Sequence, residues 1–303
     1  MDLNQLKTFV TVAEEQHLTR AAERLFTSQP AVSAQLKALE GTLGVTLFDR
    51  TPKGMQITPA GQTLLPQARA ALEAAHSVLT HAKAIQGQVN GTLSIGINTD
   101  FAFLRLAQIL ASTQADYPDI KLSFVNSMSP DIIIDIRKGN LDTGFIYGPC
   151  TSADLSVIFL ERVETNILAP IGWADRARDA SLAELAALPW VYTTEKCPFI
   201  ALKKALFAGT NLDPAKLVYV DNEDAMRELV RAGAGIAILR SDIAELAERE
   251  GWGIRWAGAV PTIDLSIAVQ ARRLKEPMIQ AWLQQVKKHW PKANTPELAR
   301  DAI

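Results

Sequence analysis

The stretch from Leu18 to Leu43 restricts the possible fold of this chain more than any other part of the sequence. It predicts two helices joined by a tight turn, because Thr19 and Ser28 are both residue types that cap helix N-termini. Pro30 follows in the first turn of the second helix, where its missing N–H removes no hydrogen bond. The stretch is therefore expected to form a helix-turn-helix.

The second of these helices has two contrasting faces. At 100° per residue its apolar side chains form one narrow stripe, made of Val32, Leu36, Leu39 and Leu43. The other side carries small or polar groups, namely Pro30, Ser33, Ala34 and Lys37, and Gln29 and Gln35 flank them. An ordinary surface helix would carry Glu and Lys there, whereas hydroxyl, amide and methyl groups suit contact with base edges and phosphates. The pattern is typical of a recognition helix.

A short hairpin is predicted directly after this helix. Strands at about 45–50 and 55–57 flank a Pro/Gly turn. Arg50 and Lys53 near its tip could reach phosphates or a minor groove, although solvated charges in a turn are the alternative. Residues 18–58 hold five Lys or Arg against three acids, while the whole chain has a net charge of −2. A DNA-facing surface would thus be a local basic patch.

These features together resemble a known family. The residues that carry the resemblance are Ala21-Ala22, Leu25, Ser28-Gln29-Pro30-Ala31-Val32-Ser33, Leu39-Glu40, Leu43-Gly44, Leu47-Phe48, Arg50 and Thr58-Pro59-Ala60-Gly61. Over residues 1–65 the chain closely resembles the winged helix-turn-helix of LysR-type transcriptional regulators. A helical hairpin without a DNA function is the competing interpretation.

On this interpretation the recognition helix and the wing contact double-stranded DNA. The candidate base readers are Gln29, Pro30, Ser33 and Gln35. The candidate contacts to phosphates or a minor groove are Ser28, Lys37, Arg50, Thr51 and Lys53. A dimer would read two half-sites about one helical turn (~34 Å) or a multiple of it apart.

A long helix is predicted to start at Thr58-Pro59 and to continue to about residue 86. Its apolar residues between Leu65 and Ala82 alternate spacings of three and four, which is a heptad pattern that requires a partner helix. The family resemblance implies a linker helix that joins two chains, and it also implies tetramers. The heptad pattern by itself supports a homodimer.

At 303 residues the chain is long enough for two or three domains. After a Gly-rich hinge, predicted strands at 92–97, 121–125 and 143–147 alternate with helices at about 101–114 and 130–138, which indicates an α/β fold with a parallel sheet. The resemblance implies an effector domain of two α/β lobes like those of periplasmic binding proteins. We place crossovers near Glu161-Arg162 and Pro261-Thr262.

The expected domain limits follow from these assignments. The winged helix-turn-helix covers residues 1–58, and the linker helix and hinge cover 59–90. Residues 91–161 and 262–303 form lobe I of the effector domain, and residues 162–261 form lobe II.

Ligands of open α/β lobes bind beyond the carboxyl ends of strands, near helix N-termini with free N–H groups. The candidate effector contacts at such points are Asn98, Thr99, Ser127, Ser129, Gly148, Thr193, Thr194, Cys197, Phe199 and Asn222. They match the regions where the family resemblance implies a small-molecule effector. A role as a helix cap explains each of them equally well.

Two features are individual to this chain. Arg240 stands where many family members would have proline, and its guanidinium could bind a carboxylate of an effector. An ordinary surface arginine is the slightly preferred interpretation. Cys197 lies where peroxide-sensing members of the family keep one of two redox cysteines, but Cys150 is 47 residues away. A buried or cleft-lining thiol is therefore preferred over a disulfide switch.

Composition and motifs argue against other functional classes. No apolar run is long enough for a membrane span, and the N-terminus is not a basic leader, so a cytoplasmic location is expected. The two cysteines suit a reducing compartment. Neither an enzyme motif nor a group of histidines at metal-ligand spacing is present in the sequence, so no enzyme, metal or cofactor is expected. A solute-binding protein is the rival, and the first 90 residues argue against it.

Overall fold

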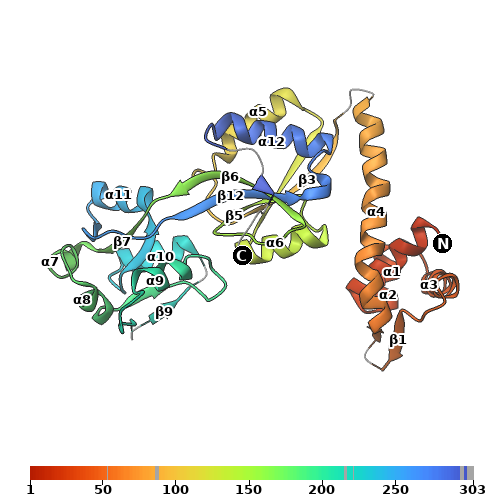
Figure 1. Cartoon of the computed structure of the whole chain (residues 1–303), viewed down its shortest axis with the longest axis horizontal. Coiled ribbons are helices and arrows are strands. Elements are labelled where there is room, and N and C mark those ends of the chain that lie inside the picture. Colours follow the sequence, from red (N-terminus) through yellow and green to blue (C-terminus); the bar gives the residue numbers. More distant parts are fainter. Residues whose placement is uncertain (53, 86–88, 215–216, 221, 294–296, 299–303) are drawn as a thin grey trace. The chain divides into compact units, whose positions relative to one another are not determined.

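The computed structural model describes residues 1–52, 54–85, 89–214, 217–220, 222–293 and 297–298. The chain divides into two compact units, Met1–Val89 and Asn90–Ile303 (Figure 1). Each unit is described by itself.

The first unit is a winged helix-turn-helix followed by a long helix. Its elements are α1 (Leu3–Glu15), α2 (Leu18–Arg24), α3 (Gln29–Leu43), β1 (Phe48–Thr51), β2 (Gly54–Ile57) and α4 (Pro59–Ile85). Ser28 is the N-cap of α3, and its hydroxyl accepts a hydrogen bond from the Ala31 N–H, as predicted. Thr19 is not a cap, because α2 already begins at the buried Leu18 and His17 takes the N-cap position.

The apolar stripe of α3 forms the core of this unit. Val32, Leu36 and Leu39 are buried, and Leu43 packs against them while partly exposed. Each buried side chain of this size contributes about 1.5–3 kcal/mol. The opposite face of α3 is thereby directed away from the core.

The wing is attached to the turn that precedes α2. The Met55 N–H donates a hydrogen bond of 2.9 Å to the Gln16 carbonyl oxygen. Gly54 has φ +126°, and a Cβ there would lie 2.4 Å from the same oxygen. Only glycine fits this position, because both the backbone conformation and the close approach exclude a side chain. The hairpin is thus held against the helical core from one side.

Lobe I of the second unit is built on a six-stranded sheet of order β13-β6-β12-β5-β3-β4. The strands are β3 (Gly91–Ile97), β4 (Ile120–Asn126), β5 (Thr143–Tyr147), β6 (Leu155–Val163), β12 (Ile263–Gln270) and β13 (Glu297–Leu298). β3 pairs in parallel with β4 and β5, whereas β12 is antiparallel to β5 and β6. The sheet is therefore mixed, not purely parallel as the alternating pattern predicted.

Helices cover both faces of this sheet: α5 (Leu106–Asp116) and α12 (Pro277–His289) lie on one face, and α6 (Ser129–Lys138) on the other (Figure 1). Successive residues of β5 contact helices on opposite faces of the sheet. The Phe145 ring packs edge-on against Trp282 of α12, whereas a Cβ on Gly144 would lie 2.4 Å from Ile132 of α6. Neighbouring residues of a strand point to opposite faces.

Lobe II contains a three-stranded antiparallel sheet of order β10-β7-β11 and a parallel pair β8-β9. Its strands are β7 (Thr165–Pro170), β8 (Trp190–Tyr192), β9 (Leu217–Tyr219), β10 (Ala237–Arg240) and β11 (Gly253–Arg255). Its helices are η1 (Ile171–Trp173), α7 (Ala174–Ala177), α8 (Leu182–Ala187), α9 (Ile200–Leu206), α10 (Glu223–Arg231) and α11 (Ser241–Glu250), and η2 (Ala271–Arg273) follows β12 in lobe I.

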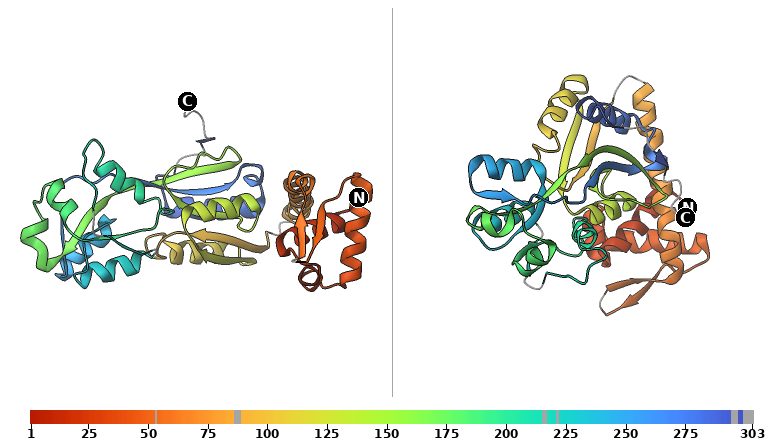
Figure 2. Two further views of the ribbon diagram at one scale, coloured as in Figure 1. Left: turned by 90° about the horizontal axis from the view of Figure 1, so that it is seen from below. Right: turned by 60° about the vertical axis from the view of Figure 1, so that its left-hand side comes forward.

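Two crossings connect the lobes (Figures 1 and 2). The first is at residue 164, between β6 and β7, and the second runs over 256–262, between β11 and β12. Pro261-Thr262 lies within the second crossing, but Glu161-Arg162 lies inside β6. That strand continues because Arg162 and Val163 still pair with Asp264 and Ile263 of β12.

Candidate functional site: a recognition helix and an interlobe cavity

The exposed surface of α3 begins at its N-terminus. Ser28, Gln29, Pro30 and Lys37 are exposed, and Ser33 is half-buried. Free N–H groups and the positive end of the helix dipole favour phosphates at such an end. The structure thus presents the predicted polar residues of α3 on a surface that a DNA duplex can reach.

The wing is joined to the recognition helix through one side chain. Arg50 of β1 donates a hydrogen bond of 2.8 Å from Nη2 to the Ser33 hydroxyl. Thr51 donates to the Gly54 carbonyl oxygen and thereby closes the hairpin turn. Arg50 and Ser33 consequently form one continuous polar surface. Lys53 lies outside the described residues.

Gln35 differs from the prediction that it reads bases. Its Oε1 accepts a hydrogen bond from the hydroxyl of Thr8, which is 1% exposed. This amide is therefore held against α1, since residue 35 lies at the edge of the apolar stripe next to Leu36. Arg20 and Arg24 also contribute less free charge than the sequence count indicated, because both are bound to Glu15.

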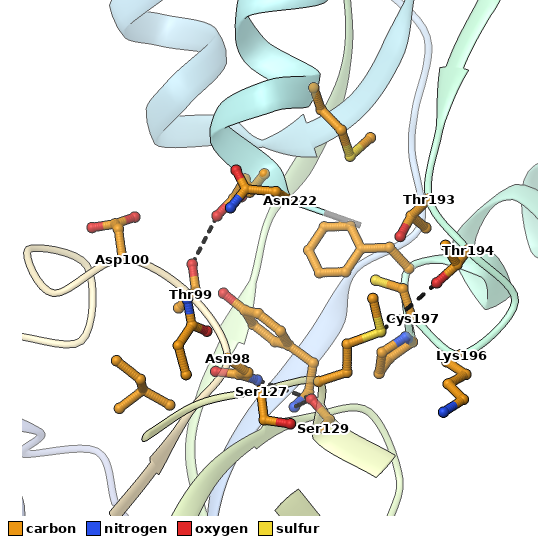
Figure 3. A pocket seen from close by; sticks show the side chains of 18 of the residues that line it. Asn98, Thr99, Asp100, Ser127, Ser129, Thr193, Thr194, Lys196, Cys197 and Asn222 are labelled. Carbon is orange, nitrogen blue, oxygen red and sulfur yellow. Dashed lines mark hydrogen bonds between the residues drawn. The ribbon is translucent and has the colours of Figure 1, made fainter. Parts of the chain in front are cut away.

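The second unit contains a cavity of about 960 Å³ that is lined by both lobes. Nine of the predicted effector contacts line it: Asn98, Thr99, Ser127, Ser129, Thr193, Thr194, Cys197, Phe199 and Asn222. In Figure 3 the labelled side chains of lobe I face those of lobe II across the cavity. Gly148 and Arg240 are not among its lining residues.

Ser129 organises the lobe I wall at the start of α6. Its hydroxyl oxygen accepts hydrogen bonds from the Asn98 side-chain amide at 3.0 Å and from the Tyr147 N–H at 2.9 Å. The ends of β3 and β5 are thereby tied to the first residue of α6. A serine that is 2% exposed has a positioning role here.

Arg240 is buried, so the preferred interpretation of a surface arginine is wrong. The residue is 2% exposed and its guanidinium lies 4.0 Å from the centre of the Phe103 ring. It forms ion pairs with Asp100 at 2.6 Å, with Glu223 at 2.7 Å and with Asp242 at 2.9 Å. The guanidinium fork is occupied by the protein's own carboxylates and does not line the cavity.

The Arg240 cluster (Arg240, Asp100, Glu223 and Asp242, with Thr99) connects the two lobes beside the cavity. Thr99 of lobe I donates a hydrogen bond of 2.8 Å to Glu223 of lobe II and accepts one from Arg240. Asp100 of lobe I completes the connection. The relative placement of the lobes is thus linked to buried charges at the cavity wall.

Burial and charge shift the pKa values in this cluster. Burial opposes ionisation of Asp100, but the hydrogen bond from the Phe103 N–H and the charge of Arg240 outweigh it, so the pKa of Asp100 is lowered. Burial raises the pKa of Glu223 despite the attraction of Arg240. Burial also raises the pKa of Tyr147, and the charge of Glu223 adds to this effect. The Tyr147 hydroxyl therefore remains protonated.

Further contacts between the lobes surround the cavity. The Thr194 hydroxyl donates to the Met128 sulfur at 3.7 Å, and Lys196 lies 3.6 Å from the Asp131 carboxylate. The Phe199 ring packs edge-on against Tyr147, with the ring centres 5.2 Å apart. A molecule in the cavity would contact both lobes at once.

Cys197 lines the cavity as a free, half-buried thiol, and Cys150 is also free. Burial raises the pKa of Cys197, although a hydrogen bond with Thr193 acts in the opposite direction. A raised pKa reduces the thiolate fraction and with it the reactivity. This agrees with a cavity-lining thiol.

Sequence reasoning missed several lining residues, among them Asp100, Asp131, Tyr147 and Glu223. For two of them the sequence contained a signal that could have predicted their place at the cavity. Tyr147 is the last residue of a strand that was predicted correctly, and Glu223 follows the predicted helix cap Asn222.

Comparisons with known proteins identify the family. The sequence model of the bacterial regulatory helix-turn-helix proteins of the lysR family matches residues 3–62, and that of the LysR substrate binding domain matches residues 86–291. This protein belongs to the LysR family. As a LysR-type transcriptional regulator it is a DNA-binding protein with an effector domain, and not an enzyme.

Two relatives show how far the similarity extends. The "Hca operon transcriptional activator HcaR" of Escherichia coli is 28% identical over 281 residues, which cover 91% of this chain and 94% of the relative. The "Uncharacterized HTH-type transcriptional regulator YnfL" of Escherichia coli is 30% identical over 264 residues, with coverage of 84% and 86%. The LysR-type architecture therefore spans nearly the whole chain.

Solved structures share the fold. Full-length OxyR from Pseudomonas aeruginosa has a TM-score of 0.75 at 24% identity and covers 98% of this chain and 99% of its own. CbnR in complex with its target DNA has a TM-score of 0.62 at 22% identity, with coverage of 95% and 99%. LysG from Corynebacterium glutamicum with the bound effector Arg has a TM-score of 0.70 at 19% identity, with coverage of 98% and 100%. Within the described residues of this LysR-type chain, no helix is both long and apolar enough to cross a membrane.

Proposed function

We propose that this LysR-type regulator reads its operator with the N-terminal part of α3 and the wing, and that a small molecule in the interlobe cavity controls this activity. Gln29, Pro30 and Ser33 are the proposed base readers. Ser28, Lys37, Arg50, Thr51 and Lys53 are the proposed contacts to phosphates or a minor groove. Their exposure on α3 and the joined surface of Arg50 and Ser33 support this assignment where the structure describes them. Lys53 rests on the sequence alone.

The cavity is the observation that supports the proposed response to an effector. It is lined by both lobes, and contacts such as those of Thr99 with Glu223 and of Thr194 with Met128 cross between the lobes at its wall. An effector shifts an equilibrium only by its differential affinity for the two states. A molecule that contacts both lobes makes different contacts in two arrangements of the lobes. Its affinity therefore differs between these two states.

The remaining parts of the proposal concern organisation. We assign residues 1–58 to DNA binding, 59–90 to the linker, 91–163 with 263–303 to lobe I, and 165–255 to lobe II. The long helix α4 would pair with a second copy of the chain in a homodimer, and two dimers would form a tetramer. CbnR with its target DNA and LysG with its effector support this division of labour by their shared fold. The cytoplasm is the proposed location.

A thermal-shift screen of the full chain against small metabolites tests the effector site. A compound that binds the folded protein raises its melting temperature in proportion to the logarithm of the free concentration once binding is saturated. The variant Ser127→Trp, which fills the cavity, should abolish the shift, whereas Ser123→Trp on the exposed side of β4 should preserve it. A shift that survives Ser127→Trp would place the effector elsewhere.

A further inference from the structure

The cavity wall carries an excess of negative charge. Its lining residues include one lysine, Lys196, and five acids: Asp100, Asp131, Glu195, Glu223 and Asp224. Behind the wall, Arg240 pairs with two of these acids, Asp100 and Glu223, and with Asp242, and Arg227 lies 3.2 Å from Asp224. An anionic ligand would therefore enter a site whose described groups already repel it.

The two helix N-termini at the cavity do not reverse this conclusion. Helix α10 begins with Asn222, whose side chain already accepts the Ala225 N–H, and its first turn carries Glu223 and Asp224. Helix α6 has Pro130, which lacks an N–H, and Asp131 in its first turn. Acids in the first turn satisfy the helix dipole that would otherwise attract an anion. Helix α10 is thus capped by a side chain of its own, whereas α6 has no side-chain cap and its dipole is balanced by Asp131.

Two buried polar atoms of the wall have no hydrogen-bond partner among the described residues. They are the hydroxyl of Tyr147, which is 6% exposed, and the side-chain oxygen of Asn98. The Tyr147 hydroxyl lies near Thr99 and Arg240, which act to lower its pKa, and near the charge of Glu223, which acts to raise it. An amide oxygen only accepts hydrogen bonds, and a tyrosine hydroxyl can accept one as well. Buried polar atoms are normally satisfied, so both point to a missing donor.

Apolar groups line the space around these acceptors. Phe199 packs against the Tyr147 ring, and Met128 and Met226 also line the cavity. Aromatic faces and thioethers favour the carbon skeleton of a ligand and, for the aromatic rings, a nearby cation. The wall therefore combines an apolar surface with acidic and hydrogen-bond-accepting groups.

We propose that the cavity binds a ligand with an apolar body and a protonated nitrogen group, an amine or a guanidine, which donates to Tyr147, Asn98 and Glu223. This inference rests on the proposed function of the cavity as the effector site. According to this inference the effector is a cation. Simple carboxylates are not expected to act as effectors at this cavity.

Three probes on one skeleton test the inference with the full-length chain. They are phenethylamine, 2-phenylethanol and 3-phenylpropionate, which differ only in a cationic, neutral or anionic end group. Binding is measured by calorimetry and by thermal shift. The amine should bind roughly tenfold or more tightly than the carboxylate, because hydrogen bonds to charged groups are about twice as strong as neutral ones. Failure of the amine to bind, or equal or tighter binding of the carboxylate, overturns the inference.

Variants show where the probe binds. They also distinguish a failure of this inference from a failure of the proposed function. Tyr147→Phe removes only the unpartnered hydroxyl and should weaken binding of the amine about tenfold. Tyr117→Phe is the matched control, because that hydroxyl bonds to Gln284 on the exposed surface. Unchanged amine affinity in Tyr147→Phe overturns the inference. Carboxylate binding that is lost in Ser127→Trp overturns the ligand class but leaves the cavity as the effector site.

Discussion

Arg240→Met removes the central charge of the cluster that joins the lobes. The substituted side chain keeps the apolar contact with Phe103 but leaves Asp100, Glu223 and Asp242 facing one another without a cation. Removing one partner of a fully buried ion pair costs about 3–5 kcal/mol. Here the Asp100 and Asp242 side chains are 40% and 53% exposed, so solvent screening reduces the expected cost to about 2–3 kcal/mol. For a domain of this size each kcal/mol lowers the melting temperature by about 2–4 °C, so a decrease of roughly 5–10 °C is expected.

Circular dichroism during thermal unfolding of the full chain measures this effect. Arg162→Met is the control, because Arg162 is 65% exposed and forms a surface pair with Asp264 at 2.9 Å. Exposed pairs contribute about 1 kcal/mol or less, so the control should lose only a few degrees. Equal losses in the two variants would refute the conclusion that the Arg240 cluster stabilises the interlobe contact.

The stability difference between wild type and Arg240→Met is expected to depend on pH. The pKa of Asp100 is lowered in the folded wild type, so its stabilising contribution is present above the ordinary Asp value of about 3.9 and is lost as the pH falls from there through the lower pKa of the folded state. Without Arg240 the clustered carboxylates repel one another, and protonation relieves this repulsion. The difference between wild type and Arg240→Met should therefore shrink on acidification. A widening difference would contradict this account.

Three further predictions concern other parts of the chain. Glu40→Ala removes the acceptor of the Leu47 N–H bond of 2.7 Å and should destabilise the first unit by about 1.5–3 kcal/mol without changing ligand binding, as judged by thermal unfolding with and without a probe. Arg50→Ala should weaken binding to all DNA sequences while changing the unfolding free energy by about 0.5 kcal/mol or less; selective loss for one sequence in gel shifts would show that it reads bases. Cys197, measured in a Cys150→Ser background, should react with iodoacetamide more slowly at neutral pH than an unperturbed thiol of pKa about 8.5, because its raised pKa keeps it protonated. Faster reaction would contradict the burial argument.

Local sequence signals predicted much of the fold. Ser28 and Pro30 marked the start of α3, because helix caps and first-turn prolines are local properties of the sequence. The helix expected from Phe101 begins only at Leu106. The side chain of Asp100 accepts the Phe103 N–H and forms a turn there instead.

Strand β6 and helix α11 are among the elements that were not assigned from the sequence. Near its end strand β6 (Leu155–Val163) carries Glu161 and Arg162, which interrupt its apolar pattern although the ladder with β12 continues through them. Helix α11 (Ser241–Glu250) is strongly amphipathic, so its apolar periodicity could have predicted it. Pairing partners decide a strand's length, and these are distant in sequence.

In the candidate site, too, local patterns predicted some residues, whereas contacts between distant parts of the chain could not be predicted. Strand ends and helix starts located nine of the cavity's lining residues, since those positions follow from the α/β pattern. The role of Arg240 could not be predicted, because its partners Asp100, Glu223 and Asp242 come together only in the folded chain. For Gln35, the contact with Thr8 of another helix determined the orientation.

The central claim is that the polar face of α3 lies in a groove of DNA, and fluorescence anisotropy tests it most directly. Binding of operator and scrambled duplexes is compared for wild type, Gln29→Ala, Lys37→Ala and the control Lys121→Ala at several salt concentrations. Lys37→Ala should weaken binding to both duplexes and lower the salt slope by about 1, and Gln29→Ala should reduce discrimination by about 1–3 kcal/mol. If the Gln29 and Lys37 variants both bind the two duplexes like Lys121→Ala, the claim is contradicted.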